Sequence, residues 1–224
     1  MNDWSTLESS ILSCRLCPRL VAWREEVALE KRRAYRDESY WGKPVPGFGD
    51  PDARVLIVGL APGAHGANRT GRMFTGDSSG DFLYSALHRA GFASQPTPHG
   101  RDDGLTLTDA YISAACRCAP PDNKPAATEL TACLPFLAAE ITLLRDIQVV
   151  VALGRIAFDA ILRSYAPITG AVTPVFAHNA VCSFGPGLPV LVTSYHPSRQ
   201  NTQTGRLTVE MFNDVWTNVQ GLLE

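Results

Sequence analysis

Four short runs of branched apolar residues recur along the chain, and each has the length and composition of a buried strand. They cover residues 54–58, 110–115, 147–153 and 189–193, and a further run over 180–184 is predicted to pair locally with the last of them. Segments with helical spacing lie between these runs. Strands that alternate with helices predict an α/β protein with a parallel sheet and helices on both of its faces.

Six helices are expected from the polar and apolar spacing, over 3–13, 19–35, 81–90, 126–144, 155–165 and 207–223. The second ends in a basic cluster, Lys31, Arg32, Arg33 and Arg36. Two interpretations remain open for this cluster. It is either a solvated helix end whose cations suit the helix dipole or a surface that contacts phosphate.

The first apolar run opens into a glycine-rich loop over residues 59–80. Glycines let the backbone approach a ligand closely, and Phe74 and Asp77 add an aromatic surface and a carboxylate. The loop has no lysine and no G-x-G-x-x-G pattern, so it is neither a P-loop nor a dinucleotide-binding loop. The alternative is a plain surface connection.

Chemistry-bearing residues gather in the other loops that follow predicted strands, where ligands of parallel sheets bind. These loops cover residues 116–125, 153–155 and 194–206. The last one contains His196, Arg199 and Arg206 and has no acidic residue, which suits an anion. In the loop over 116–125, the amide of Asn123 offers an acceptor beside a donor, matching N3–H and O4 of uracil. The alternative is that Asn123 helps to start the next helix.

Composition restricts the class of protein. The chain has 224 residues, 45% of them hydrophobic, and a net charge of −2, so no global basic field indicates a nucleic-acid partner. No apolar run approaches the length of a membrane span, and the first residues lack the features of a signal peptide. We expect a cytoplasmic protein with one domain over 1–224, in which residues 1–50 form a helical and loop segment.

The cysteines form a metal-site pattern. Cys14 and Cys17 are spaced as C-x₂-C in the N-terminal segment, and 14 residues separate Cys118 from Cys133. Four thiolates in a reducing compartment indicate zinc or an iron–sulfur cluster, and the spacing alone does not choose between them. Cys116 could replace Cys118 in this set.

Several longer stretches can now be read together. They are CRLCPR over 14–19, PVPGFGDP over 44–51, GLAPGAHG over 59–66, FTGD over 74–77, RCAPPDNKP over 117–125 and YHPSRQNTQTGRLT over 195–208. In this combination the chain resembles the uracil-DNA glycosylase superfamily, most closely its fifth, iron–sulfur-containing branch (type B). The fourth branch has an acidic residue where Leu60 stands here.

The resemblance implies a three-layer α/β/α sandwich with a four-stranded parallel sheet. It also implies a [4Fe–4S] cluster on Cys14, Cys17, Cys118 and Cys133. The expected activity is hydrolysis of the N-glycosidic bond of uracil, and of deaminated purines such as hypoxanthine, in double-stranded and single-stranded DNA. We expect the enzyme to act as a monomer on a base that is flipped out of the helix.

The resemblance also assigns roles to single residues. The base-stacking aromatic falls on Phe74, the base-reading amide on Asn123 and the last-motif histidine on His196. Ala64, beside Gly63, stands where other branches have a polar, water-activating residue, and these two belong to the expected substrate-binding set.

We expect Asp77 to stabilise the cationic sugar and orient water, and His196 to stabilise the departing base. Arg199 and Arg206 are expected to hold phosphates, together with Arg69 and Arg72. Two alternatives remain. One is an iron–sulfur redox or DNA-sensing module without catalysis, and the other is a nucleotide-binding hydrolase, which the missing lysine disfavours.

Overall fold

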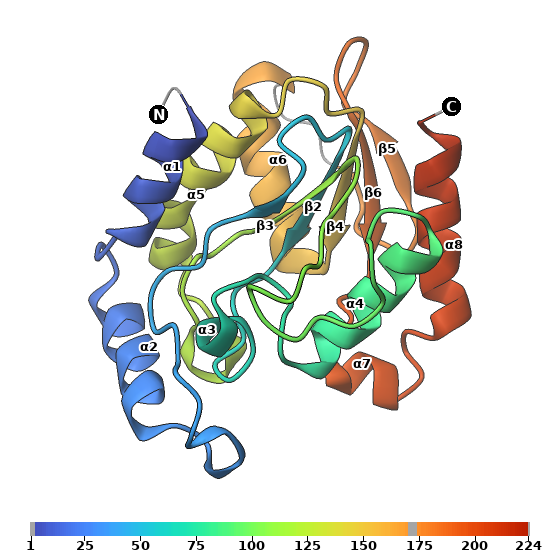
Figure 1. The fold of residues 1–224 in the computed structure, drawn as a ribbon. Coiled ribbons are helices and arrows are strands. Elements are labelled where there is room, and N and C mark those ends of the chain that lie inside the picture. The colour runs from blue at the N-terminus through green and yellow to red at the C-terminus, as the bar shows by residue number, and fades with distance from the viewer. Residues whose placement is uncertain (1–2, 170–173, 224) are drawn as a thin grey trace.

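A six-stranded sheet forms the centre of the computed structural model, which describes residues 3–169 and 174–223 (Figure 1). The strand order is β1-β3-β2-β4-β6-β5. The strands are β1 (Phe48–Gly49), β2 (Val55–Gly59), β3 (Ala110–Ala114), β4 (Val149–Leu153), β5 (Val181–Ser183) and β6 (Val190–Ser194). The central four, β3, β2, β4 and β6, are parallel to one another.

The expected four-stranded sheet was incomplete, because a short antiparallel strand extends each edge. At one edge β5 pairs with β6, as the local pairing over 180–184 predicted. At the other edge β1 pairs with β3 inside the segment that was expected to be only a loop. A two-residue strand has no alternating pattern, so the sequence gives no signal for it.

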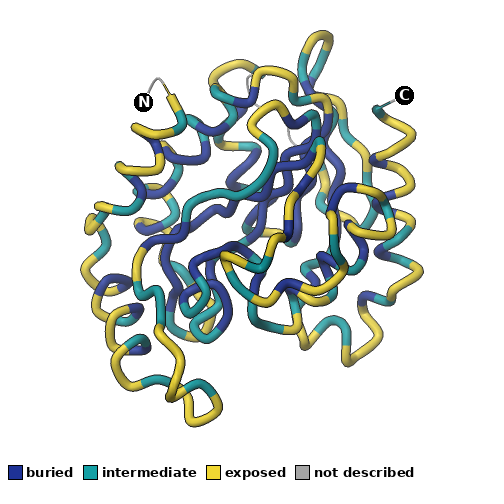
Figure 2. Tube along the Cα trace, in the orientation of Figure 1, coloured by how far each residue is buried: buried dark blue, intermediate teal, exposed yellow. Residues whose placement is uncertain are grey.

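Helices cover both faces of the sheet, as the alternation of elements predicted. They are α1 (Trp4–Leu12), α2 (Pro18–Glu30), α3 (Ala67–Thr70), α4 (Ser78–Arg89), α5 (Ala127–Leu143), α6 (Arg155–Thr169), α7 (Arg199–Gln203) and α8 (Val209–Gly221). Alternate residues of β2 enter opposite cores: Val55 and Ile57 pack in the core with α4 and α8, whereas Leu56 and Val58 pack in the core with α5 and α6. Figure 2 shows these central strands as buried along their length, and the loops below them as partly exposed. Within the described ranges, no helix is both long enough and apolar enough to cross a membrane.

The second helix ends earlier than expected. It stops at Glu30 rather than at Tyr35, because Lys31 takes a left-handed backbone conformation with φ of 53°. A separate 3₁₀ turn, η1 (Arg33–Tyr35), follows. The Lys31 ammonium donates to the carbonyl oxygens of Arg36 and Glu38 at 3.2 and 2.7 Å, which stabilises the reversal of the chain. No glycine or proline marks this stop in the sequence.

A buried ion pair fixes the start of the loop after β3. Arg117 and Glu140 are both fully buried and paired, and Glu140 also accepts hydrogen bonds from Ser113 at 2.5 Å and Tyr111 at 3.3 Å. Removing one partner alone from a buried pair of this kind destabilises the folded protein by about 3–5 kcal/mol. The network joins β3 to α5 and thereby positions the loop between them.

Candidate active site

A cleft of about 910 Å³ opens where the central strands end. Its walls come from the loops after β2, β3, β4 and β6, the four loops that the sequence marked. Three of the predicted site residues outside the cysteines, Arg69, Arg72 and Arg206, do not line this cleft. The seven that do are Gly63, Ala64, Phe74, Asp77, Asn123, His196 and Arg199. Residues that lie as far apart as 63 and 199 in the chain therefore meet at one place.

Asp77 is the N-cap of α4, and this cap is the reason that the helix begins at Ser78 rather than at Asp81. Its Oδ1 accepts hydrogen bonds from the backbone N–H groups of Ser79 and Gly80 at 3.0 and 3.1 Å. Its Oδ2 lies against Gly63 and Gly66, where a side chain would collide with it. Burial raises the pKa of the Asp77 carboxyl, and the two backbone hydrogen bonds oppose that shift only in part.

The Phe74 ring forms part of the cleft wall and lies against Gly59 at the end of β2. A Cβ added at Gly59 would lie within 2.7 Å of the ring, so the glycine is needed for this position of the phenyl group. The Phe74 backbone is left-handed, with φ of 52°. The ring centroids of Phe74 and His196 lie 5.9 Å apart with an angle of 28° between the planes.

His196 reaches the same cleft from the end of β6. Gly154, at the end of β4, makes room for it, since a Cβ there would lie 3.1 Å from the His196 Cβ. The Asn201 side chain donates to the His196 carbonyl oxygen at 2.8 Å and fixes the local backbone. Burial lowers the pKa of the His196 imidazole to about 4, so the ring is neutral at pH 7.

Asn123 lies in a 3₁₀ turn, η2 (Pro121–Asn123), that follows β3. Its backbone and that of Asp122 are left-handed, with φ of 56° and 53°. Its side chain is exposed and makes no hydrogen bond within the described part of the chain. The alternative role as a helix start does not hold, because α5 begins later, at Ala127. Both hydrogen-bonding groups of the amide therefore remain available to a ligand.

The arginines of the glycine-rich loop have internal partners. Arg72 is buried and makes two hydrogen bonds with the Asp103 carboxylate, at 2.7 and 2.6 Å. Arg69 pairs with Glu38 and donates to the Gly76 carbonyl oxygen at 3.0 Å. The expectation that both hold phosphates was therefore wrong, because their donors already stabilise the loop.

The two arginines of the last loop are exposed and differ in position. Arg199 begins the short helix α7, which the sequence did not predict, and lines the cleft. Arg206 lies beyond that helix, with its guanidinium carbon 4.8 Å from the centre of the Tyr195 ring. Neither forms an ion pair within the described residues, so both charges face solvent.

Further lining residues had little or no signal in the sequence. His65 accepts or donates a hydrogen bond at 3.0 Å between its Nδ1 and the Tyr40 hydroxyl, and burial lowers its pKa. It could have been noticed as the only histidine of the glycine-rich loop. Arg32 and Tyr35 also line the cleft, and they come from the N-terminal segment, whose position relative to the sheet no local pattern predicts.

Three of the four cysteines of the predicted metal site pack together, and the fourth, Cys14, packs in another apolar cluster with Leu7, Ile11 and Phe136; all four are free thiols. Cys116, Cys118 and Cys133 pack in one apolar cluster with Leu20 and Cys17. Arg24, which is buried, donates from Nη1 to the Cys118 Sγ at 2.9 Å. Burial raises the pKa of Cys118 to about 11, and the Arg24 charge opposes that shift.

The arrangement of these thiols does not fit a single ion. Within the described residues, no group of three or more His, Cys, Asp or Glu side chains is placed to hold one metal ion. A four-iron cluster takes one thiolate on each iron, so its ligands surround a larger body. The four predicted cysteines come from two segments, with an apolar surrounding and a guanidinium beside one sulfur, and this donor set fits such a cluster.

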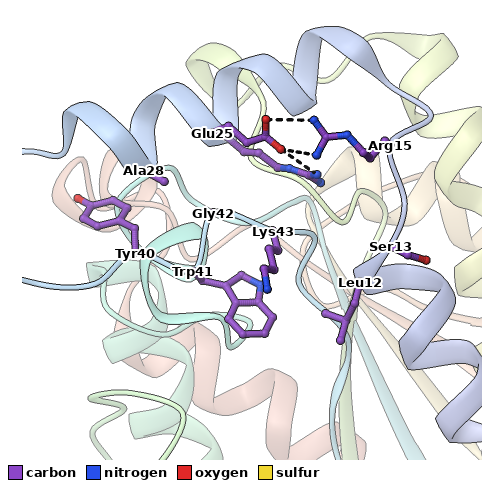
Figure 3. Close-up of a pocket in the computed structure, with 10 residues that line it drawn as sticks. Leu12, Ser13, Arg15, Glu25, Ala28, Tyr40, Trp41, Gly42 and Lys43 are labelled. Atoms are coloured by element: carbon purple, nitrogen blue, oxygen red, sulfur yellow. Dashed lines mark hydrogen bonds and ion pairs between the residues drawn. The ribbon is translucent and has the colours of Figure 1, made fainter.

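A second cavity, of about 420 Å³, lies between α2 and residues 40–43 (Figure 3). Arg15 and Glu25 are joined there by two hydrogen bonds, at 2.6 and 3.1 Å. Trp41 and Lys43 form the facing side. None of the predicted site residues lines this cavity, so the larger cleft is the candidate active site.

Known proteins of one superfamily are similar to this chain over most of its length. Residues 46–220 match the family model described as "Uracil DNA glycosylase superfamily". A type-5 uracil-DNA glycosylase of Thermus thermophilus is 55% identical over 213 residues, which cover 95% of each chain. Proteins of the same name are 52% identical in Mycobacterium bovis, over 96% of this chain and 80% of that one, and 47% identical in Pyrobaculum aerophilum, over 92% and 87%.

Proposed function

Since the chain belongs to the uracil DNA glycosylase superfamily and to its type-5 branch, we propose that it removes uracil from DNA by hydrolysing the N-glycosidic bond. The product is an abasic site, and the enzyme is a monofunctional glycosylase of DNA repair. The observation that carries this function is the convergence of Phe74, Asp77, Asn123 and His196 on one cleft. Four loops surround these side chains. A module that only binds a cluster, without catalysis, would not require this convergence.

Base recognition uses Phe74 and Asn123. The bond to the base cannot be reached inside the duplex, so the nucleotide is flipped into the cleft. Stacking on Phe74 offsets part of the energy of unstacking. The free amide of Asn123 then pairs with N3–H and O4 of uracil, and it mismatches the corresponding edge of cytosine. The backbone at Gly63 and Ala64 closes the pocket on the side of the glycine-rich loop.

Bond cleavage uses Asp77 and His196 at opposite ends of the breaking bond. As the bond between C1′ and the base breaks, positive charge develops on the sugar and negative charge on the base. The Asp77 carboxylate stabilises the sugar cation and orients the water that adds to C1′. That water loses one proton as it adds to C1′, and one proton finally reaches the departed base, so the reaction balances as hydrolysis.

His196 acts as a neutral hydrogen-bond donor. Its pKa of about 4 leaves one ring N–H and no charge at neutral pH. A neutral imidazole can donate to the base O2 as negative charge grows there, which is the type of stabilisation that a preorganised donor supplies. The ring centroids of His196 and Phe74 lie 5.9 Å apart, which supports the proposal that this donor acts at the edge of a base stacked on Phe74.

The cluster cysteines hold the N-terminal segment against the rest of the enzyme. Cys14, Cys17, Cys118 and Cys133 would bind a [4Fe–4S] cluster, with the Arg24 guanidinium beside the Cys118 sulfur. When bound, such a cluster cross-links two distant segments and can carry an electron. No step of the hydrolysis needs either property.

Cleavage of a defined oligonucleotide tests this function. Purified protein is incubated with a duplex that contains one uracil, and abasic sites are detected as alkali-labile breaks. The matched duplex with thymine at that position is the control, and the Asp77→Asn protein is the control for a contaminating enzyme. We expect breaks only at uracil, and at a rate lower by about 10²–10³ with the Asp77→Asn protein. A folded, cluster-containing protein that produces no breaks at any salt concentration would leave the module without catalysis as the better description.

A further inference from the structure

A basic arm, residues 31–40, contributes to the lining of the cleft, and the arm and α7 lie apart from each other at the lower end of the molecule (Figure 1). In that view the arm is the blue loop at the lower left of the molecule, below α2, and α7 lies at the lower right. Arg32 and Tyr35 of the arm line the same cleft as Arg199 and Gln200 of the last loop. The two basic segments thus both contribute to the lining of one cleft.

Lys31 donates to carbonyl oxygens within the arm, whereas the three arginines of the arm have no ion-pair partner among the described residues. Arg32, Arg33 and Arg36 are exposed, and within the described residues none of them forms an ion pair. This contrasts with Arg69 and Arg72 of the glycine-rich loop, whose charges are neutralised inside the protein. The alternative role in the helix dipole also weakens, because α2 ends at Glu30 and these three residues lie beyond it.

The arm is held to the glycine-rich loop by several contacts. Arg69 pairs with Glu38, and its guanidinium carbon lies 4.0 Å from the centre of the Tyr35 ring. The Tyr40 hydroxyl bonds to His65, and the backbone N–H of Trp41 donates to the Arg69 carbonyl oxygen at 2.9 Å. These contacts give the arm a defined position beside the cleft. Of its two acidic residues, Glu38 is occupied by Arg69, which leaves Asp37 as the one exposed carboxylate without an ion pair in the described arm.

We propose that the basic arm is a phosphate-binding surface that holds the DNA backbone on one side of the flipped nucleotide, while Arg199 holds it on the other. This inference rests on the proposed function for the identity of the ligand as DNA. Phosphate contacts carry no sequence information, so the arm should contribute equally to damaged and undamaged DNA. A protein with a net charge of −2 needs such local clusters to bind a polyanion.

Two double variants with the same change of charge test the arm. Arg33→Ala/Arg36→Ala removes two cations of the arm. The control, Arg145→Ala/Arg163→Ala, removes two exposed arginines that do not line the cleft: Arg145 follows α5, and Arg163 lies in the second half of α6. Arg32 is left unchanged because it lines the cleft. Binding of an undamaged duplex is measured by fluorescence anisotropy over a range of salt concentrations, and single-turnover cleavage of the uracil duplex is measured at saturating protein.

We expect the arm variant to bind more weakly by roughly tenfold per lost contact near 0.1 M salt, with the salt slope reduced by about 0.9 per contact. Its cleavage rate at saturation should equal that of the wild type. Arg33→Lys/Arg36→Lys should restore the slope, because it restores the charge. The control variant should match the wild type in every measurement.

The arm is not a DNA surface if its alanine variant and the control variant bind with the same affinity and the same slope. Failure of the proposed function gives a different result. In that case the wild type would bind DNA in a salt-dependent way, and lose that binding in the arm variant, without cleaving uracil at all.

Discussion

Replacing Asp77 by asparagine separates the two roles that the structure gives to this side chain. The asparagine carbonyl oxygen can accept the same hydrogen bonds from Ser79 and Gly80, and asparagine is as good an N-cap as aspartate. The negative charge toward the sugar is lost. We expect single-turnover cleavage of uracil to fall by about 10²–10³, or roughly 3–4 kcal/mol, the scale of one preorganised electrostatic group.

Stability should respond differently to asparagine and to alanine. Asp77→Ala removes the cap as well as the charge, and a lost cap destabilises by about 1 kcal/mol, which lowers Tm by about 2–4 °C in a chain of this size. Asp77→Asn keeps the cap. Because the pKa of Asp77 is raised in the folded state, its carboxyl favours folding below the ordinary value of 3.8 and opposes it as pH rises through the folded pKa. At pH 7 the asparagine variant should therefore be no less stable than the wild type, and its advantage should disappear toward pH 4.

Thermal unfolding followed by circular dichroism at pH 4 and 7, together with single-turnover rates, checks both expectations. An asparagine variant that cleaves uracil at nearly the wild-type rate would refute the catalytic role. The glycine-rich loop would then hold the base without catalysing, and the backbone groups of Gly63 and Ala64 would become the candidates for placing the water. An asparagine variant that unfolds as early as the alanine variant would refute the separation of charge from cap.

The remaining predictions concern the base, the leaving group and the cluster. His196→Ala should slow cleavage of uracil by about 10²–10³ and of 5-fluorouracil by less, because fluorine already stabilises the departing anion; equal losses in single-turnover assays would contradict this. Because burial lowers the pKa of His196 in the folded state, the free energy of unfolding of the wild type should fall as pH drops from about 6.5 toward 4. Denaturant titration should show a weaker pH dependence for His196→Ala. Asn123→Asp, which keeps the left-handed turn but removes the amide donor, should blur the choice between uracil and other bases in competition assays, with little change in Tm. The purified protein should be brown; Cys118→Ser should lose the visible absorbance and Cys116→Ser should keep it, and the opposite result would exchange their roles.

The central strands and the positions of the four loops were predictable from sequence, because a buried parallel strand leaves a continuous apolar run. The edge strand β1 was not, since two residues carry no pattern. The end of α2 at Glu30 was also unpredictable, because it depends on the Lys31 ammonium reaching carbonyl groups of residues that follow it.

Within the site, residue type alone could not separate free from occupied arginines. Arg69, Arg72 and Arg199 look alike in sequence as cations in polar loops. Only the fold shows that Glu38 neutralises Arg69 and that Asp103 neutralises Arg72. The predicted helix began at 81 and missed the N-cap at Asp77, although an aspartate followed by serines and a helical pattern is a typical helix start.

The packing of Asp77 against glycines has a genetic consequence. A side chain at Gly66 would take the space of Oδ2, and one at Gly63 would lie 2.7 Å from the same atom. Substitutions at these positions should therefore be epistatic, because the effects of changing contacting residues are not additive. Gly66→Ala should be harmful when residue 77 is aspartate and much less harmful when residue 77 is alanine. A scan that changes one position at a time would report both Gly63 and Gly66 as intolerant. What the fold restricts, however, is the combined volume of the side chain at either glycine position and the side chain at position 77.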